Sequence, residues 1–458
     1  MAKRGVNKKS RSGQPPPRNR RASAAAAATI SELPDDVIFD ILVKTPDIKS
    51  IIRCKGVCKK WRKMILQPYF AKSLISSGSL PLSLIFYSPS NGPTNPAHFG
   101  ILELDDDDLA SLGRQNAAVT FRSEIYIPHE GYKGRVIGAC NGLVCLRVDK
   151  DIVVCNPILQ GQPPFVLPKL PELTHYRSRF GFGFSLLSDE YKVLRCNEAH
   201  GGHILSFAVF TIGRDDTWRR VYRGHDGKPF PRSCTSLGID FVFVNGALYW
   251  VGRDMASRLS LCYFDVENEE LGSTLSLPCQ IDGIVHLGVL DKFLYVFDVH
   301  WPSHVNVWVM RDYIRTGAWT WKWVLKLPYP RGLVGPIQPI QILKDGTVLM
   351  ILNKFIADEN KYGKVLASHN PQTGLTEIIK YHEVLFWTES IAHTPSFLCP
   401  PWLLRRWWLK VVEHGSGGGG EAFEYVHVVM VASGGWRGGG GGRVVMIMIV
   451  VAPWRCER

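Results

Sequence analysis

The 458-residue sequence predicts an α+β chain of more than one domain, with a small helical unit followed by a long all-β region. Apolar residues recur at helical spacing between residues 31 and 74. From about residue 80 this period gives way to short β-type runs bounded by Gly, Asn, Asp and Pro, and turn-strand units then repeat at long, regular intervals. With 45% hydrophobic residues, the chain can bury a sizeable core.

Two helices are expected first. Pro34 suits a first helical turn, and the apolar face behind it consists of Val37, Ile38, Ile41 and Leu42. Thr45-Pro46 should end this helix, because a residue before proline avoids the helical region. Asp47 is then placed to cap a short second helix that carries Ile48, Ile51 and Ile52.

A third helix is predicted to follow, with one apolar and one basic face. The apolar stripe is Val57, Cys58, Trp61, Met64 and Ile65, and the basic face is Lys55, Lys59, Lys60, Arg62 and Lys63. Three helices in about 40 residues lie near the lower size limit for independent folding. Part of their apolar surface should therefore need a partner.

The same segment resembles an F-box. The matching residues, in order, are Leu33-Pro34-Asp35, Ile41-Leu42, Pro46, Lys49 to Arg53, Val57 to Arg62 and Pro68-Tyr69-Phe70; Thr45 and Gly56 depart from the usual pattern. The resemblance implies that residues 30–75 dock on a Skp-type adaptor, and through it on a cullin. The expected adaptor-binding residues are Leu33, Pro34, Ile38, Ile41, Leu42, Ile51, Val57, Cys58 and Trp61. The alternative is an ordinary three-helix unit inside a larger core.

The net charge of +13 is concentrated before the helices. Residues 1–29 hold eight Lys and Arg and no acid, in a composition that predicts a disordered arm. This arm could be a nuclear-import signal, a weak nucleic-acid contact or a plain solubilising tail. Because the rest of the chain is nearly neutral, a dedicated nucleic-acid binder is not expected.

The cysteines and the hydropathy of the sequence indicate the cell compartment in which the chain is expected. Eleven cysteines without a framework, and no N-terminal signal with an apolar core, favour the nucleus or the cytoplasm. The longest apolar run, residues 444–452, is far shorter than the ~20 residues of a membrane helix, so no membrane segment is expected.

The all-β region contains a repeat. Turn pairs precede apolar strands at Asn141-Gly142, Asp189-Glu190, Asn245-Gly246, Asp291-Lys292 and Asp345-Gly346, which start 48, 56, 46 and 54 residues apart. A period near 50 in β sequence is typical of kelch-type propeller blades. With further strand-like stretches at 82–127 and 363–390, the sequence predicts a kelch-like β-propeller of about six blades, closed by pairing strands from its two ends.

These segments also resemble the F-box-associated region of plant F-box proteins. The resemblance covers about residues 80–399 and includes Gly138 to Leu146, Asn156-Pro157, Phe180 to Phe184 and Phe243 to Trp250. It implies a protein-interaction domain that selects substrates for ubiquitination. The aromatic residues within it are expected to be blade core rather than a binding site.

No catalytic, metal or cofactor site is predicted. Cys140 and Cys145, Cys54 and Cys58, His200 and His203, and His300 and His304 are close pairs, but no two pairs combine into a zinc spacing. Structural burial is the better interpretation of these residues. Gly181-Phe182-Gly183 lacks the rest of a dinucleotide fingerprint, and no phosphate-binding loop or nucleophile elbow occurs.

Substrate recognition is expected on loops at one propeller face. The candidate loops are Glu198 to His203, Arg223 to Arg232, Arg253 to Arg258 and His300 to His304. Their basic and histidine side chains predict a preference for an acidic or phosphorylated protein segment, with Arg223, Lys228 and Arg232 as substrate contacts.

The remaining residues, 400–458, form a Gly-rich irregular tail that does not continue the blade pattern. One hypothesis is that this tail is not an evolved part of the fold. For the whole chain, the sequence favours a ligase adaptor without chemistry of its own. The alternatives are a kelch-like propeller enzyme or sugar-binding module, and an F-box scaffold that acts outside a ligase.

Overall fold

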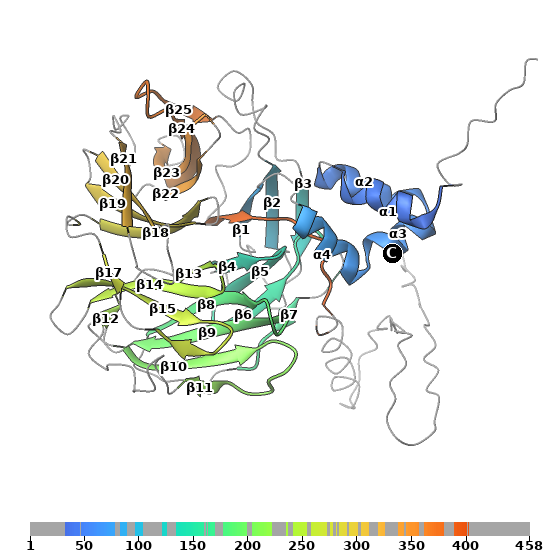
Figure 1. Cartoon of the computed structure of the whole chain (residues 1–458), viewed down its shortest axis with the longest axis horizontal. Coiled ribbons are helices and arrows are strands. Elements are labelled where there is room, and N and C mark those ends of the chain that lie inside the picture. Colours follow the sequence, from blue (N-terminus) through green and yellow to red (C-terminus); the bar gives the residue numbers. More distant parts are fainter. Residues whose placement is uncertain are drawn as a thin grey trace, which may run out of the picture.

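A cluster of short helices lies beside a large assembly of antiparallel sheets (Figure 1). The structure is a computed structural model of the whole chain. The structure describes residues 33–45, 47–77, 83–88, 97–103, 121–125, 134–159, 162, 164–169, 177–198, 204–221, 235–236, 241–253, 258–272, 275–277, 281, 284–290, 293–300, 304–310, 319–325, 338–342, 345–356, 361–379, 389–400 and 402. The predicted basic arm and almost all of the predicted Gly-rich tail lie outside these ranges.

Four helices form the N-terminal region, where the sequence predicted three. They are α1 (Asp35–Val43), α2 (Ile48–Val57), α3 (Lys59–Ile65) and α4 (Pro68–Ser77). The additional helix begins at Pro68, and its buried residues Phe70, Ala71 and Leu74 have helical spacing. In the sequence, Pro68-Tyr69-Phe70 contributed only to the F-box resemblance, and no helix was predicted there.

The caps of α2 and α3 confirm one prediction and correct another. Asp47 caps α2, because its Oδ1 accepts a hydrogen bond from the Ser50 N–H at 2.7 Å. Val57 and Cys58, however, do not belong to the apolar stripe of the third helix. Val57 is the last residue of α2, and Cys58 is the N-cap of α3, with its Sγ accepting from the Trp61 N–H at 3.4 Å.

The described strands pair into six antiparallel sheets. Five of these sheets use strands that follow one another in the chain, and the sixth joins β26, the last strand, to β1, β2 and β3. The strands are β1 (Ser83–Ser88), β2 (Ala97–Glu103), β3 (Phe121–Ile125) and β26 (Glu389–His393); β4 (Gly134–Cys140), β5 (Leu143–Val148), β6 (Asp151–Cys155) and β7 (Phe165–Val166); β8 (Arg177–Ser185), β9 (Glu190–Glu198), β10 (Ile204–Thr211) and β11 (Arg219–Val221); β12 (Thr235–Ser236), β13 (Val242–Val244), β14 (Ala247–Arg253), β15 (Leu259–Asp265), β16 (Glu270–Leu271) and β17 (Leu275–Ser276); β18 (Ile284–Leu290), β19 (Phe293–His300), β20 (His304–Met310) and β21 (Trp319–Leu325); β22 (Gln338–Ile342), β23 (Val348–Ile356), β24 (Lys361–His369) and β25 (Thr376–Ile379).

Neighbouring sheets meet through one strand of each sheet. β26 contacts β4, β4 contacts β8, β8 contacts β13, β13 contacts β18, and β18 contacts β22. The structure is therefore a four-helix N-terminal region followed by a β-propeller, as the period near 50 residues predicted.

The repeated turn pairs that the structure describes lie where one strand of a sheet reverses into the next, and Asp291-Lys292 lies outside the described residues. Asn141-Gly142 joins β4 to β5, and Asn245-Gly246 joins β13 to β14. All four residues have positive φ, from 47° to 84°, as a tight type I′ hairpin turn requires. At Gly142 a side chain would also collide with Ser396, because a Cβ there would lie 2.7 Å from the Ser396 Cβ. In the repeats whose turn pair is described, the sequence period thus marks a hairpin.

The two ends of the β region pair with each other, as predicted. β26 is antiparallel to β1, with Phe86 opposite Ser390 and Ile85 opposite Ile391. The last strand thereby completes the sheet that the first strand begins, which closes the ring.

Beyond β26, residues 394–400 form a strap that crosses to the helices (Figure 1). Buried Asn156 holds this strap, since its Nδ2 donates to the main-chain oxygens of Ser396 and Leu398 at 2.8 and 2.9 Å. Ser396 Oγ donates in turn to the Asn141 carbonyl at 2.7 Å. Trp402, assigned by the sequence to the irregular tail, packs against Phe165 with ring centroids 5.2 Å apart.

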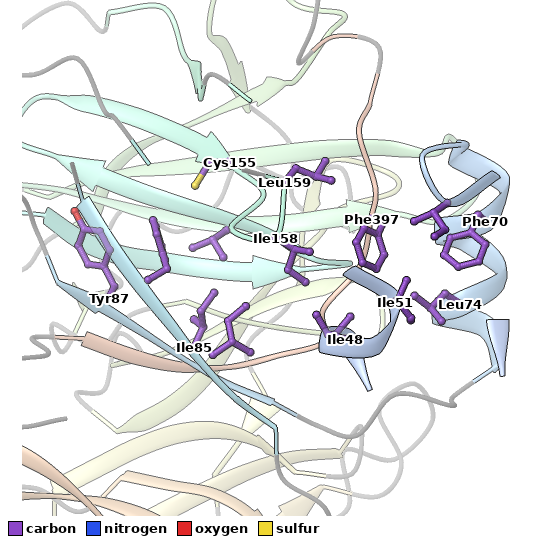
Figure 2. Packing of buried hydrophobic residues seen from close by; sticks show 14 of the residues in the cluster. Ile48, Ile51, Phe70, Leu74, Ile85, Tyr87, Cys155, Ile158, Leu159 and Phe397 are labelled. Carbon is purple, nitrogen blue, oxygen red and sulfur yellow. The ribbon is translucent and has the colours of Figure 1, made fainter. Parts of the chain in front are cut away.

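A large apolar cluster joins the helices to the propeller. Figure 2 shows Phe397 of the strap between Ile158, on the propeller, and the helical residues Ile51 and Phe70. The Phe397 ring is fully buried, and its centroid lies 6.3 Å from that of Phe70. Because the core is continuous, the helices and the propeller share buried surface rather than folding as separate bodies.

Ion pairs join the sheet β8–β11 to the turn between β15 and β16. Glu269, in that turn, accepts from Lys192 of β9 at 2.9 Å and from Arg219 of β11 at 2.5 Å. Lys192 is only 3% exposed and also donates to the Val266 carbonyl at 2.8 Å. Burial alone would raise the pKa of Glu269, but the hydrogen bonds from Arg219 and Lys192 lower it to about 2.

Glu269→Gln should destabilise the chain by roughly 3 kcal/mol at pH 7, because a fall in pKa from 4.5 to about 2 has that value. Since the folded pKa is lowered, this contribution is present above pH 4.5 and is lost as the pH falls toward 2. Urea unfolding at pH 7 and at pH 3 measures the difference between the variant and the wild type, which should shrink at the lower pH. Asp216→Asn, at an exposed position nearby, is the matched control and should have little effect; equal losses in both variants would contradict the assignment.

Candidate functional site

The helices expose several large apolar side chains. Val37 and Ile41 lie one turn apart on α1 and are 40% and 45% exposed, and Val57 at the end of α2 is 60% exposed. Tyr69 of α4 is also exposed and stacks on Phe39 of α1 with ring centroids 5.4 Å apart. Exposed apolar side chains gathered on one small unit are typical of a protein-binding surface.

The predicted adaptor-binding residues divide into two groups in the structure. Pro34, Ile41, Val57 and Cys58 are exposed, and Leu33 is half-buried. The others are buried in the cluster shared with the propeller: Ile38, Leu42, Ile51 and Trp61. The buried residues hold the helices against the propeller, and of the exposed ones Cys58 also caps α3. Helical period alone did not separate the groups, because it assigned Val37 and Ile41 to the same face as Ile38 and Leu42.

Polar contacts fix the helices on the sheets. The Ile48 N–H donates to Oε1 of Glu103, at the end of β2, at 2.7 Å. Burial raises the pKa of Glu103, and the Ile48 hydrogen bond opposes that rise. Lys72 of α4 pairs with Asp189, in the β8–β9 turn, at 2.7 Å. Lys55 lies 5.8 Å above the Phe397 ring, and burial followed by repulsion from Arg62 lowers its pKa.

These contacts place the helices at one end of the sheet β8–β11. Asp189 follows Ser185, the last residue of β8, whereas Arg177 begins β8 at the opposite end. The N-terminal end of β8, at Arg177, is therefore the end that lies away from the helices.

The four cysteines of the predicted close pairs differ in burial: Cys145 is buried, Cys54 and Cys140 are half-buried, and Cys58 is exposed. Cys145 is fully buried, and burial raises the pKa of the Cys140 thiol to about 12, so the thiolate form is scarce at neutral pH. Cys58 is exposed and acts as a helix cap, contrary to the expectation of burial. Among the described residues, no group of three or more His, Cys, Asp or Glu side chains could hold a metal ion. His200 and His203 lie outside the described residues.

His300 and His304 face each other across the β19–β20 hairpin. Their rings stack with centroids 4.5 Å apart, and Asp298, which is fully buried, lies 2.8 Å from His300 Nε2. Asn306 Nδ2 donates to the same carboxylate at 3.1 Å. The arrangement supplies hydrogen-bond partners to a buried carboxylate.

The predicted substrate contacts Arg223, Lys228 and Arg232 lie outside the described residues. Val221, the last described residue before them, pairs with Phe207 in the first half of β10.

Trp250 and Phe182 are two of the aromatic residues predicted as blade core, and both are fully buried, as expected. In the described helices, none is long and apolar enough to cross a membrane.

Two known families match this chain. The family described as F-box-like matches residues 30–75, and the family described as F-box associated beta propeller domain matches residues 110–398. An F-box/kelch-repeat protein of Arabidopsis thaliana is 24% identical over 332 residues, which cover 70% of this chain and 85% of the relative. An F-box protein of the same plant is 26% identical over 402 residues, which cover 80% of this chain and 91% of the relative.

Solved structures resemble the chain only distantly. A luciferin-regenerating enzyme aligns over 65% of this chain and 96% of its own, with a TM-score of 0.33 and 9% identity. Aleuria aurantia lectin aligns over 67% of this chain and 98% of its own, with a TM-score of 0.34 and 8% identity. With one family matching the helical region and the other matching more than half of the sequence across the sheets, the chain belongs to the F-box proteins that carry an F-box associated β-propeller domain.

Proposed function

We propose that the chain is the substrate-recognition subunit of an SCF-type (Skp-cullin-F-box) E3 ubiquitin ligase. Its F-box would bind a Skp-type adaptor, and through it a cullin, while the propeller would bind a protein substrate for ubiquitination. The chain itself would supply no catalytic residue and no cofactor. The observation that carries the proposal is an F-box-like region with exposed apolar side chains, held rigidly on a β-propeller.

The domains in this proposal keep the boundaries derived from the sequence. Residues 30–75 are the F-box and residues 80–399 are the propeller, in which each of the six sheets is one blade. Arg223, Lys228 and Arg232 remain proposed substrate contacts, and the nucleus or the cytoplasm remains the proposed location.

Leu33→Ala combined with Pro34→Ala should reduce recovery of the Skp-type adaptor by roughly tenfold or more, because losing a buried Leu contact costs about 1.5 to 3 kcal/mol. Pro34 is exposed beside α1 and Leu33 is half-buried, so the propeller should stay folded. The measurement is co-purification of tagged chain from plant cells, with the adaptor and the cullin quantified together.

The same experiment separates the alternatives. Recovery of both adaptor and cullin with the wild type supports a ligase subunit, and recovery of the adaptor without cullin favours a scaffold outside the ligase. Adaptor recovery that is unchanged in the double variant would show that this end of the F-box is not the docking site.

A further inference from the structure

Two arginines from neighbouring sheets meet at Ser178, near the first end of β8. Arg195 of β9 donates from Nε and Nη2 to Ser178 Oγ, at 3.1 and 2.9 Å. Arg147 of β5 donates from Nη1 to the main-chain oxygen of the same serine at 3.1 Å. The Arg147 guanidinium also lies over the Phe180 ring, 5.7 Å from its centroid, which helps to hold it in position.

Neither arginine has an acidic partner in the part of the chain that the structure describes. The other hydrogen bond of Arg147 goes from Nε to the Asp149 carbonyl at 3.1 Å, and Arg195 Nη1 has no partner within the described residues. Glu198, at the same end of β9, is already engaged, because Arg179 Nε reaches both of its carboxylate oxygens at 2.8 and 2.9 Å.

Within the residues that the structure describes, two positive charges thus lie close together and neither is paired with an acid. Arg195 is only 7% exposed, and burying a guanidinium without a counter-charge is unfavourable. Burial, followed by repulsion from Arg147, lowers the pKa of Arg195. An anion that bound both groups would remove the repulsion and supply the missing hydrogen-bond acceptors.

We propose that Arg147 and Arg195 form a binding site for the phosphate group of a phosphorylated protein segment. A phosphorylated side chain carries a charge of about −1.5 to −2 at pH 7, which matches two guanidinium groups better than a single carboxylate does. The planar forks of two arginines also fit several phosphate oxygens at once. That the ligand is a protein rests on the proposed function. The arginine pair adds that the group it recognises on this protein is a phosphate.

The position of the site suits a substrate receptor. Ser178 lies near the start of β8 and Arg195 near the end of the antiparallel strand β9, whereas Lys72 of α4 binds Asp189 beyond the last residue of β8. Arg147 of β5 reaches the same Ser178. The strand between Ser178 and Ser185 spans about 23 Å at the usual rise per residue. A ligand at the arginine pair would thus be well separated from an adaptor bound to the helices.

Direct binding tests the site with the purified full-length chain. The probe is a pool of fluorescent peptides with a fixed central phosphoserine and random flanks, compared with pools that have serine or aspartate at that position. Wild type should bind the phosphoserine pool more tightly than either other pool. Arg147→Gln and Arg195→Gln should each weaken that binding by roughly tenfold or more, as expected for a lost charged hydrogen bond.

Arg220→Gln is the matched control. Arg220 is an exposed arginine on β11 of the same sheet, so the variant makes the same charge change away from the site and should bind as wild type does. Arg147 is exposed, so its variant should fold normally, which circular dichroism verifies even if the Arg195 variant unfolds.

Three results would overturn the proposal. The serine pool could bind as tightly as the phosphoserine pool, the aspartate pool could do so, or the Arg220 variant could lose as much affinity for the phosphoserine pool as the Arg147 variant. The last would indicate general attraction to a basic protein. No adaptor is needed in this assay, so its outcome is independent of whether the chain assembles into a ligase.

Discussion

Phe397→Ala should cost about 3 to 5 kcal/mol of unfolding free energy, the range for removing a fully buried phenyl ring. The Phe397 ring is inaccessible to solvent and packs between Ile158, Phe70 and Ile51, where the strap, the sheets and the helices meet. The helices should therefore loosen from the propeller first, and amide hydrogen exchange in α2 and α4 should rise more than exchange in β8–β11.

Phe293→Ala is the matched control, because Phe293 at the start of β19 is 39% exposed and lies in another sheet. Phe293→Ala should lower the unfolding free energy by only a small fraction of the loss in Phe397→Ala. Urea unfolding followed by hydrogen exchange measures both effects. Exchange that rises equally throughout the Phe397 variant would argue against a junction specific to the helices and the strap.

Ile41→Lys combined with Val57→Lys should weaken adaptor binding by a hundredfold or more. Each exposed side chain would bury most of its apolar surface on docking, and two such residues are worth about 3 to 5 kcal/mol together. Because Ile41 and Val57 are 45% and 60% exposed, their replacement by lysine should leave the unfolding free energy nearly unchanged. Surface plasmon resonance with purified adaptor gives the affinity, and thermal unfolding gives the stability.

Leu187→Lys combined with Leu375→Lys is the control for this variant. Both leucines are exposed, at 85% and 57%, but they lie in turns of the propeller rather than on the helices. The control should bind the adaptor as wild type does. Full binding by the Ile41 and Val57 variant would instead place the docking surface on other residues.

Local sequence determined the features that depend on neighbouring residues. Asp47 caps α2 because a short acceptor precedes a helical run, and Asn141-Gly142 and Asn245-Gly246 form tight turns because both pairs adopt positive φ. The regular spacing of such turns was enough to predict a propeller, and the need to close the ring predicted the pairing that β26 makes with β1. In the same way, the ordered F-box residues predicted the family that the comparison found.

Only the tertiary structure decided which apolar residues are buried and which charges are left unpaired. Ile38 and Ile41 are equivalent by period, yet the first is buried against the shared core and the second is exposed. That difference depends on Phe397, more than 350 residues away in the chain, which no local pattern connects to α1. The pair formed by Arg147 and Arg195 arises likewise from two sheets meeting at Ser178. Burial and charge pairing are properties of surfaces that come together only on folding, and so they follow from the tertiary structure rather than from residue order.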